Sequence, residues 1–386
     1  MLLKNPEKNN MERQCTIFNV LGIIWLKNLI ASASGIGEYD NSKQSRKTQL
    51  NNIKTMKNFL KTGVLMTLAL AAPQAIMAQL FSDNFGTSTI NAAGTPTSTS
   101  TSYDFDTTKS ASTESIASGD LKFTLPTSTT GLIEAEALFT TSPVTLQNTG
   151  DYIDLTYTFQ DTAYVLTGST SAWLATGLYN GSQVSPATGQ VLLNAANAQT
   201  GGAQNWQGYF GRITAASGNS YIWSRPQQTG GSDSGTSSAQ DLLANTATTG
   251  AFAKTVPPSV AGSQVGANLA QSVTLTTGNM YTVDYRLTLG SVTPGDLTIS
   301  DSLYSGVGTG GSELFTQTGT TGAAPITSTY DGLGIGMYYS GSSDQPILDI
   351  SQITITTDVP EPSTLALLGS GMVLLQMARR RLQTRV

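Results

Sequence analysis

Alternating hydrophobic and polar positions recur through the middle of this sequence. Tyr152–Phe159 reads YIDLTYTF, which places hydrophobic side chains on one face and Asp or Thr on the other. Met280–Leu289 reads MYTVDYRLTL and repeats the pattern. Successive side chains of a β-strand point to opposite faces, so this alternation predicts two half-buried strands.

Shorter runs of the same kind predict further strands, and Gly, Ser, Thr, Asn and Pro between them predict turns. We expect these strands at Leu121–Leu125, Leu132–Phe139, Ala172–Tyr179, Gly208–Ile213, Tyr221–Ser224, Val273–Thr276, Leu297–Ser300, Leu333–Tyr339 and Ile347–Thr356. In the last of them the hydrophobic parity changes between Ile350 and Ile353, which predicts a β-bulge near Ser351–Gln352. The fourth and fifth read as neighbouring strands of a hairpin.

This pattern predicts one all-β domain over residues 79–358, an antiparallel β-sandwich of jelly-roll type. Gln227–Gly266 has little strand signal and is expected to form a long surface loop, with helical periodicity only near Ala239–Ala244. In size and strand order the body is similar to concanavalin-A-like lectin and glucanase sandwiches. That resemblance implies a fold and no particular function.

A first membrane-directed segment, a short helix, precedes the body. Met56–Ala78 has a positive start at Lys57 and Lys61, a short hydrophobic core and a helix-breaking proline. This layout is typical of a secretory signal peptide cut between Ala78 and Gln79; the alternative is a true membrane anchor. Residues 1–55 differ in composition from the remainder and are interpreted as a disordered upstream extension that is not part of the native protein.

A second membrane-directed segment ends the chain at residues 359–386. Val359–Pro362 reads VPEP and precedes the uncharged run Ser363–Ala378, which is followed by Arg379, Arg380 and Arg381. A helix of this length spans ~24 Å, slightly less than a ~30 Å hydrocarbon core, and the arginines can bridge the difference. Positive flanks stay cytoplasmic, so the body would face outward. The alternative is a buried helix at the end of a soluble fold.

These three parts together resemble the PEP-CTERM sorting tail. The resemblance implies that an exosortase, a membrane cysteine protease, recognises Pro360, Glu361 and Pro362 and processes the tail. Insertion would fall to residues 363–378 and topology to the basic end at 379–386. It further implies export through the Sec translocon in a Gram-negative, exopolysaccharide-producing bacterium. The protein would be anchored in the inner membrane during transit and then reach the cell surface or extracellular matrix.

Charge and composition disfavour or exclude several classes of function. Residues 79–358 hold six Lys and Arg against twenty Asp and Glu, a balance of −14, which disfavours nucleic-acid binding. The chain has no histidine, so Ser–His and Cys–His nucleophile pairs are excluded. Its one cysteine, Cys15, precedes the expected mature protein, which therefore has neither a disulfide nor a zinc–thiolate cluster.

Acidic pairs are the first candidates for chemistry. Glu134 and Glu136 in LIEAEALF share one strand face, as paired carboxylates of a glycosidase would. Glucanases of the similar fold use Glu-x-Asp-x-x-Glu, whereas this stretch lacks the Asp and has Phe139 in the last position. We therefore expect two solvent-facing acids and no enzyme. We expect no cofactor, but the ligands of a structural calcium ion could come from Asp104 with Asp106, Asp151 with Asp154, or Asp296 with Asp301.

Aromatic side chains are the second candidates. Trp206, Tyr209, Tyr221 and Trp223 cluster within NWQGYFGRI and SYIWSR, where they either pack in the core or form a platform for sugar rings. The leading hypothesis is an exported envelope or matrix protein with a structural or adhesive role and no catalysis. The alternatives are a lectin-like carbohydrate-binding module, whose partner would be an exopolysaccharide, and then a glycoside hydrolase.

Overall fold

A computed structural model describes the body of the chain with a few gaps. The described residues are 78–90, 92, 95–107, 111–127, 131–166, 172–181, 206–215, 219–227, 242–243, 262–267, 269–291, 295–322, 325–339 and 344–359. The chain divides into units 1–74 and 75–386, and every described residue belongs to the second. The predicted extension, all but the last residue of the signal peptide and the tail from Pro360 onward lie outside the described residues.

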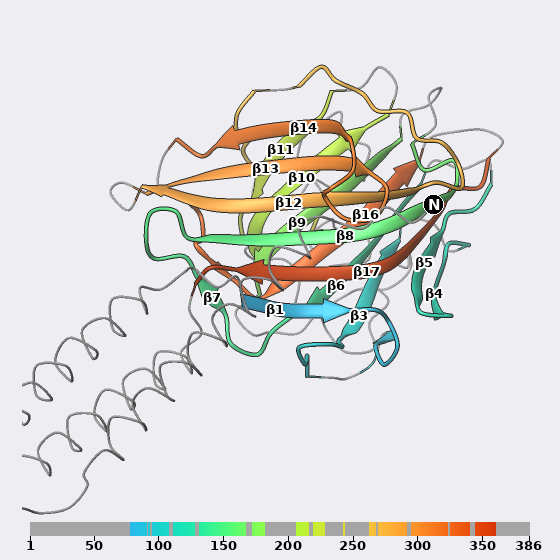
Figure 1. The fold of residues 1–386 in the computed structure, drawn as a ribbon, viewed down its shortest axis with the longest axis horizontal. Helices are drawn as coiled ribbons and strands as arrows, with labels where there is room; N and C mark the ends of the chain where they lie inside the picture. The colour runs from blue at the N-terminus through green and yellow to red at the C-terminus, as the bar shows by residue number, and fades with distance from the viewer. Residues whose placement is uncertain are drawn as a thin grey trace, which may run out of the picture. The chain divides into compact units, whose positions relative to one another are not determined.

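Eight strands form the sheet that lies nearer the viewer in Figure 1, called the front sheet. They are β1 (Ala78–Asp83), β4 (Thr113–Ala117), β5 (Asp120–Thr124), β8 (Tyr152–Ala163), β12 (Met280–Ser291), β13 (Asp296–Ser305), β14 (Glu313–Thr320) and β17 (Ile347–Thr357). Their order is β14-β13-β12-β8-β17-β5-β4, and β1 pairs with β17 as well. The two longest alternating segments of the sequence thus form the adjacent central strands β8 and β12.

Seven strands form the back sheet, in the order β11-β10-β9-β16-β6-β3-β2. They are β2 (Thr89–Ile90), β3 (Ser102–Thr107), β6 (Gly131–Leu138), β9 (Trp173–Asn180), β10 (Gln207–Thr214), β11 (Tyr221–Arg225) and β16 (Gly332–Tyr339). A small ribbon pairs β7 (Val144–Thr145) with β15 (Thr329–Tyr330). Among the described strands only β2 and β3 pair in parallel. The prediction of an all-β, two-sheet sandwich is therefore confirmed.

The main hydrophobic core fills the space between the two sheets. The inward residues of β8 are Ile153, Leu155, Tyr157 and Phe159, and each is at most 1% exposed. Inward residues of β12, β13 and β17 join them, as do those of the back sheet. Burial of this apolar surface is the main driving force that holds the layers together. The register of β17 against β8 shifts between Ile350 and Gln352, which confirms the predicted bulge.

Two sequence expectations differ from the structure. Val273–Thr276 is not a strand: Val273 forms only an isolated bridge with Ala215, and Leu275 N–H donates to Leu166 O. Both hydrophobic side chains are buried, so this segment lines the core without extended pairing. Conversely, β14 was not expected, because its buried positions are Phe315, Gln317 and Gly319, of which only Phe315 is a large hydrophobic residue.

Candidate functional site

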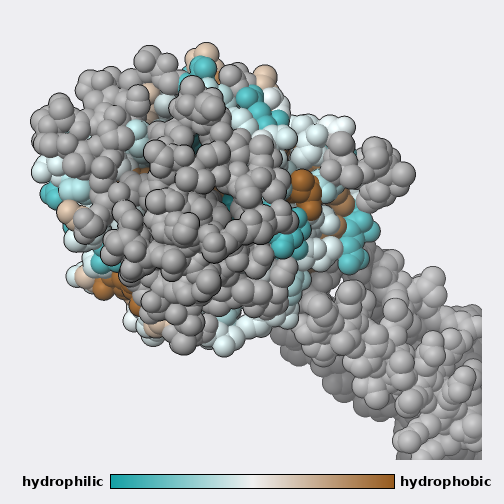
Figure 2. Space-filling model, turned by 180° about the vertical axis from the view of Figure 1, so that it is seen from behind, coloured by the Kyte–Doolittle hydropathy of each residue, from teal (hydrophilic) through white to brown (hydrophobic). Residues whose placement is uncertain are grey.

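The outward face of the back sheet carries acids at one side and aromatic residues at the other. Cross-strand pairing sets two parallel rows, with glycine or alanine between the two groups. The first row is Asp104, Glu136, Gly334, Gly177, Phe210 and Trp223, and the second is Asp106, Glu134, Gly336, Ala175, Arg212 and Tyr221. Figure 2 shows the molecule from this side, where the coloured surface is mainly hydrophilic or neutral with small hydrophobic patches.

The acidic side of this face is buried. Glu134 and Glu136 share one strand face, as predicted, but both are 0% exposed, so the expectation that they face solvent is wrong. Glu134 Oε1 accepts a hydrogen bond of 2.9 Å from Leu242 N–H. Asp104, their neighbour on β3, is 2% exposed, and burial raises its pKa to about 7. The alternating sequence pattern predicted that Glu134 and Glu136 share one face of their strand. It did not predict the segment that covers this face.

The covering contact comes from Leu242–Leu243, inside the stretch predicted as a surface loop. Both side chains are 0% exposed, and Leu242 O accepts a hydrogen bond of 2.6 Å from the Tyr179 hydroxyl. A Cβ added to Gly336 would lie 2.7 Å from Leu243 Cδ1 and 3.0 Å from a backbone oxygen. Glycine in β16 thus leaves room for the leucines. The described part of Gln227–Gly266 that includes these leucines is a packed contact rather than a solvated loop.

Two of the four candidate sugar-binding rings are core residues. Trp206 is 0% exposed and lies 6.3 Å from the Tyr179 ring, while Tyr209 is 1% exposed within the core between the sheets. The Tyr209 hydroxyl accepts a 2.7 Å hydrogen bond from Ile326 N–H, and burial raises its pKa to about 12. Neither ring has a face that is accessible to a sugar, so both residues serve in packing.

The other two rings are half-buried, and one of them stacks on the guanidinium of Arg212. Tyr221 and Trp223 lie on β11 with ring centroids 6.3 Å apart. The Arg212 guanidinium stacks between Tyr221, at 4.5 Å from the ring centroid, and Trp173, at 4.8 Å. Burial lowers the pKa of Arg212 to about 10. A guanidinium that can donate hydrogen bonds beside flat aromatic rings is an arrangement that suits a sugar. The predicted hairpin of β10 and β11 places Arg212 next to Tyr221.

The structure separates the two acids of one predicted calcium pair and gives those of another pair different partners. Among the described residues no group of three or more Asp, Glu, His or Cys could hold a metal ion. Asp296 and Asp301 lie five residues apart on β13, so they point to opposite faces of the front sheet. Asp154 instead pairs with Arg286, and Asp151 accepts hydrogen bonds from Gln147 N–H and Asn148 N–H.

The predicted signal cleavage site and sorting tail adjoin the described body. Ala78, the residue before the expected cut, begins β1 and pairs with Thr357 at the end of β17. Tyr152 N–H donates to Asp358 at 2.8 Å, which fixes the first residue after β17. The body therefore has its first and last strands side by side, and both expected membrane-directed segments start from there. Within the described part of the chain, no helix has the length and hydrophobicity to span a membrane.

Comparison with known proteins identifies the tail. Residues 358–381 match the family model of the PEP-CTERM protein-sorting motif, which confirms the resemblance based on Pro360–Pro362 and Arg379–Arg381. The motif implies processing by an exosortase and export to the cell surface. The comparison with curated proteins found no significant match to this sequence.

Among solved structures, several lectin domains and one lyase are similar to the body at low identity. The Emp47p carbohydrate recognition domain is 11% identical with a TM-score of 0.35, over 74% of this chain and 98% of that chain. Lectin II from Ulex europaeus is 10% identical with a TM-score of 0.31, over 66% and 92%. The PL-14 alginate lyase from Aplysia kurodai is 10% identical with a TM-score of 0.34, over 64% and 86%. Similarity this low shows no shared activity.

Proposed function

We propose that this chain is an exported cell-envelope or extracellular-matrix protein, sorted by an exosortase-type protease, with a structural or adhesive role and no catalysis. The observation that carries the proposal is the sorting motif at residues 358–381, which follows the last strand of the sandwich directly. Burial of Glu134 and Glu136, with Leu242 N–H bound to Glu134, supports a body without hydrolytic activity. Transport would proceed through the Sec translocon, with transient anchoring in the inner membrane.

Processing of both ends is the first test. In the producing cells, we expect the exported protein to begin at Gln79 and to lack the basic end, because the signal peptidase and the exosortase cut on either side of the body. Alanine at Pro360, Glu361 and Pro362 is expected to leave the tail uncut and the protein in the membrane fraction. Intact-mass spectrometry of cell fractions measures both, with Ser363→Ala as the neighbouring control. Full-length wild-type chain dissolved in the cytosol would contradict the proposal.

A second candidate function, carbohydrate binding, is favoured by the half-exposed rings beside Arg212. Tyr221 and Trp223 present partly open surfaces, and the guanidinium stacked on Tyr221 holds that ring in place. Sugars bind proteins through hydrogen bonds combined with apolar contact to flat side chains, which this hairpin provides. The nearby matrix polysaccharide of the producing cell would be the ligand.

A glycan array tests this candidate. Trp223→Ala is expected to weaken any binding at this hairpin by at least about fivefold, because truncation of a tryptophan at the centre of a binding contact can cost more than about 1 kcal/mol. Tyr164→Ala is the matched control, since Tyr164 is 42% exposed and follows the end of β8 in the other sheet. Equal binding by wild type and Trp223→Ala would exclude the hairpin as the contact surface.

A further inference from the structure

The outward face of the front sheet is covered with hydroxyl groups. The polar halves of β8, β12 and β17 point away from the core, and cross-strand pairing aligns them with β13 and β14. One such row reads Thr354, Thr156, Asp284, Ser302 and Thr316. Neighbouring strands lie ~4.8 Å apart, so the row presents closely spaced groups that both donate and accept hydrogen bonds.

A hollow of about 200 Å³ opens on this face above β8. Its floor includes Thr156, Thr158, Thr282, Gln352 and Thr354, and one wall is formed by residues 307–309. It is smaller than the ~300–1,000 Å³ of pockets that enclose a drug-sized ligand. A hollow of this size suits a single unit of a longer ligand, with the remainder outside.

The wall of the hollow is fixed by the sheet below it. The Thr282 hydroxyl donates to Gly306 O at 2.9 Å and accepts from Gly308 N–H at 2.8 Å. Gly306 and Gly308 have φ values of +84° and +75°, which glycine adopts without strain, so the chain can turn back over the strands. Thr158 lies 3.2 Å from the same hydroxyl. The hollow is therefore preformed, which lowers the entropic cost of binding.

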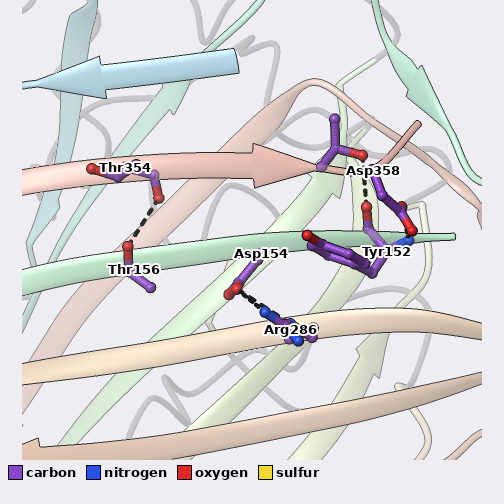
Figure 3. Close-up of polar contacts among 7 residues, drawn as sticks. Tyr152, Asp154, Thr156, Arg286, Thr354 and Asp358 are labelled. Atoms are coloured by element: carbon purple, nitrogen blue, oxygen red, sulfur yellow. Dashed lines mark hydrogen bonds and ion pairs between the residues drawn. The ribbon is translucent and has the colours of Figure 1, made fainter. Parts of the chain in front are cut away.

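Several polar groups in the hollow retain hydrogen-bonding capacity. Gln352 and Thr309 are exposed, and Thr156 and Thr354 are half-exposed. The Thr156 hydroxyl makes only a long, 3.5 Å contact with Thr354 O, shown in Figure 3. Exposed Val307 stands at the rim as an apolar surface. Hydroxyls and an amide beside one apolar side chain match a sugar, which has hydroxyl edges and an apolar C–H face.

The polar strip continues along β8 from the hollow toward its first residue. Asp154 follows Thr156 and holds Arg286 by a 2.5 Å ion pair, and Arg286 lies 4.5 Å from the centroid of the Tyr152 ring. Figure 3 shows these groups side by side on the three strands β8, β12 and β17. Thr158 to Tyr152 spans ~20 Å at ~3.3 Å per residue, enough for several sugar units.

Charge selects among possible polysaccharides. The body carries −14 by sequence, so a uronic acid polymer would meet repulsion from the protein as a whole. Burial, together with its contact to Asp154, raises the pKa of Asp284 to about 8, so Asp284 is mainly neutral at pH 7, while Asp154 is paired with Arg286. The strip thus favours an uncharged ligand.

We infer that the hollow binds one unit of an uncharged, hydroxyl-rich polysaccharide, whose chain continues along β8 over Asp154 and Tyr152. The inference deepens the proposed adhesive role and rests on it. It places the contact on the face opposite to the Tyr221–Trp223 hairpin, so the two surfaces can be tested separately.

Affinity electrophoresis in native gels tests the inference with the full chain. The protein is kept in lauryldimethylamine oxide, a detergent without a sugar headgroup, and the gels contain dextran, laminarin or alginate. We expect one of the two neutral polymers to slow the wild type and alginate to leave it unchanged. Thr156→Val combined with Gln352→Ala removes two hydrogen-bonding groups. The affinity for the polymer, obtained from the retardation at several polymer concentrations, is expected to fall ~30-fold. Thr318→Val, at an exposed position on β14, is the matched control.

Each outcome decides between the surfaces. Loss of retardation in the double variant but not in Thr318→Val or Trp223→Ala supports the hollow, provided that circular dichroism shows the same fold. Retardation that survives the double variant and disappears in Trp223→Ala overturns the inference and favours the hairpin. Retardation by alginate alone overturns the charge argument. The absence of retardation in all three gels overturns the inference, while export and tail processing would still support the envelope role.

Discussion

Replacing Trp206 by alanine is expected to lower the free energy of unfolding by about 3–5 kcal/mol, because it empties a large, fully enclosed site. Trp206 is 0% exposed and belongs to the second hydrophobic cluster, on the outward face of the back sheet. A Cβ on Gly332 would lie 2.5 Å from its ring, and one on Gly181 would lie 2.8 Å away. Its backbone oxygen accepts a hydrogen bond from Arg225 Nη1. Urea unfolding followed by circular dichroism measures the effect.

The control for this variant is the same substitution at Trp223. That side chain is half-exposed on β11, so its removal is expected to cost much less stability than removal of Trp206. The pair of variants separates two roles that the sequence left open for tryptophan, packing and ligand contact. Equal and small stability changes in the two would show that Trp206 is not enclosed as described.

Local alternation predicted most of the sandwich. In β8 and β12, which have one hydrophobic face in the core, a period of two appears in the sequence, and a change of parity marks the bulge of β17. Strands with few large hydrophobic residues were missed. Edge strand β14 buries only every second position of a Thr-rich segment, and β4 has no buried position. Such strands form because their neighbours provide hydrogen-bonding partners, which local sequence does not encode.

The candidate sites were less predictable, because burial on an outward sheet face depends on distant segments. The LIEAEALF pattern gives the common face of Glu134 and Glu136, but their burial follows from Leu242 and Leu243, more than 100 residues later. The hollow on the front sheet likewise combines β8, β12 and β17 with residues 307–309. The sequence does predict the polar face of each alternating strand. It does not predict the strand order, which places the polar faces of β8, β12 and β17 next to one another.

The stability of the body is expected to fall as the pH rises from about 4 to about 8. Burial raises the pKa of Asp301 from 3.8 to about 7 and that of Asp104 to about 7, while the pKa of Asp284 is raised to about 8. In the unfolded chain these carboxyls titrate near 3.9. Within that window the folded state therefore binds more protons, and unfolding becomes easier as protons are removed. Thermal unfolding at closely spaced pH values measures the slope.

Asp301 is the residue through which this pH dependence can be dissected. It is 1% exposed on the inward face of β13, and its Oδ2 accepts a 2.9 Å hydrogen bond from Gln317 Nε2. The same amide nitrogen also contacts Arg212 O and Tyr221 O, at 3.2 Å each, so this polar group links the two sheets. Ionisation places a charge between the layers without a cation to pair with it among the described contacts of Asp301.

Asp301→Asn is expected to flatten the pH profile and to stabilise the protein at pH 8. A pKa unit corresponds to ~1.4 kcal/mol, so avoiding the buried charge raises stability there by up to about 4 kcal/mol. At pH 4 the wild-type carboxyl is neutral, and the two proteins should differ by about 1 kcal/mol or less, because asparagine can still accept from Gln317. Glu313→Gln, at an exposed position on β14, is the control for loss of a charge. If Asp301→Asn were destabilising at pH 8 as well as at pH 4, the carboxylate itself would be a stabilising part of the link between the sheets.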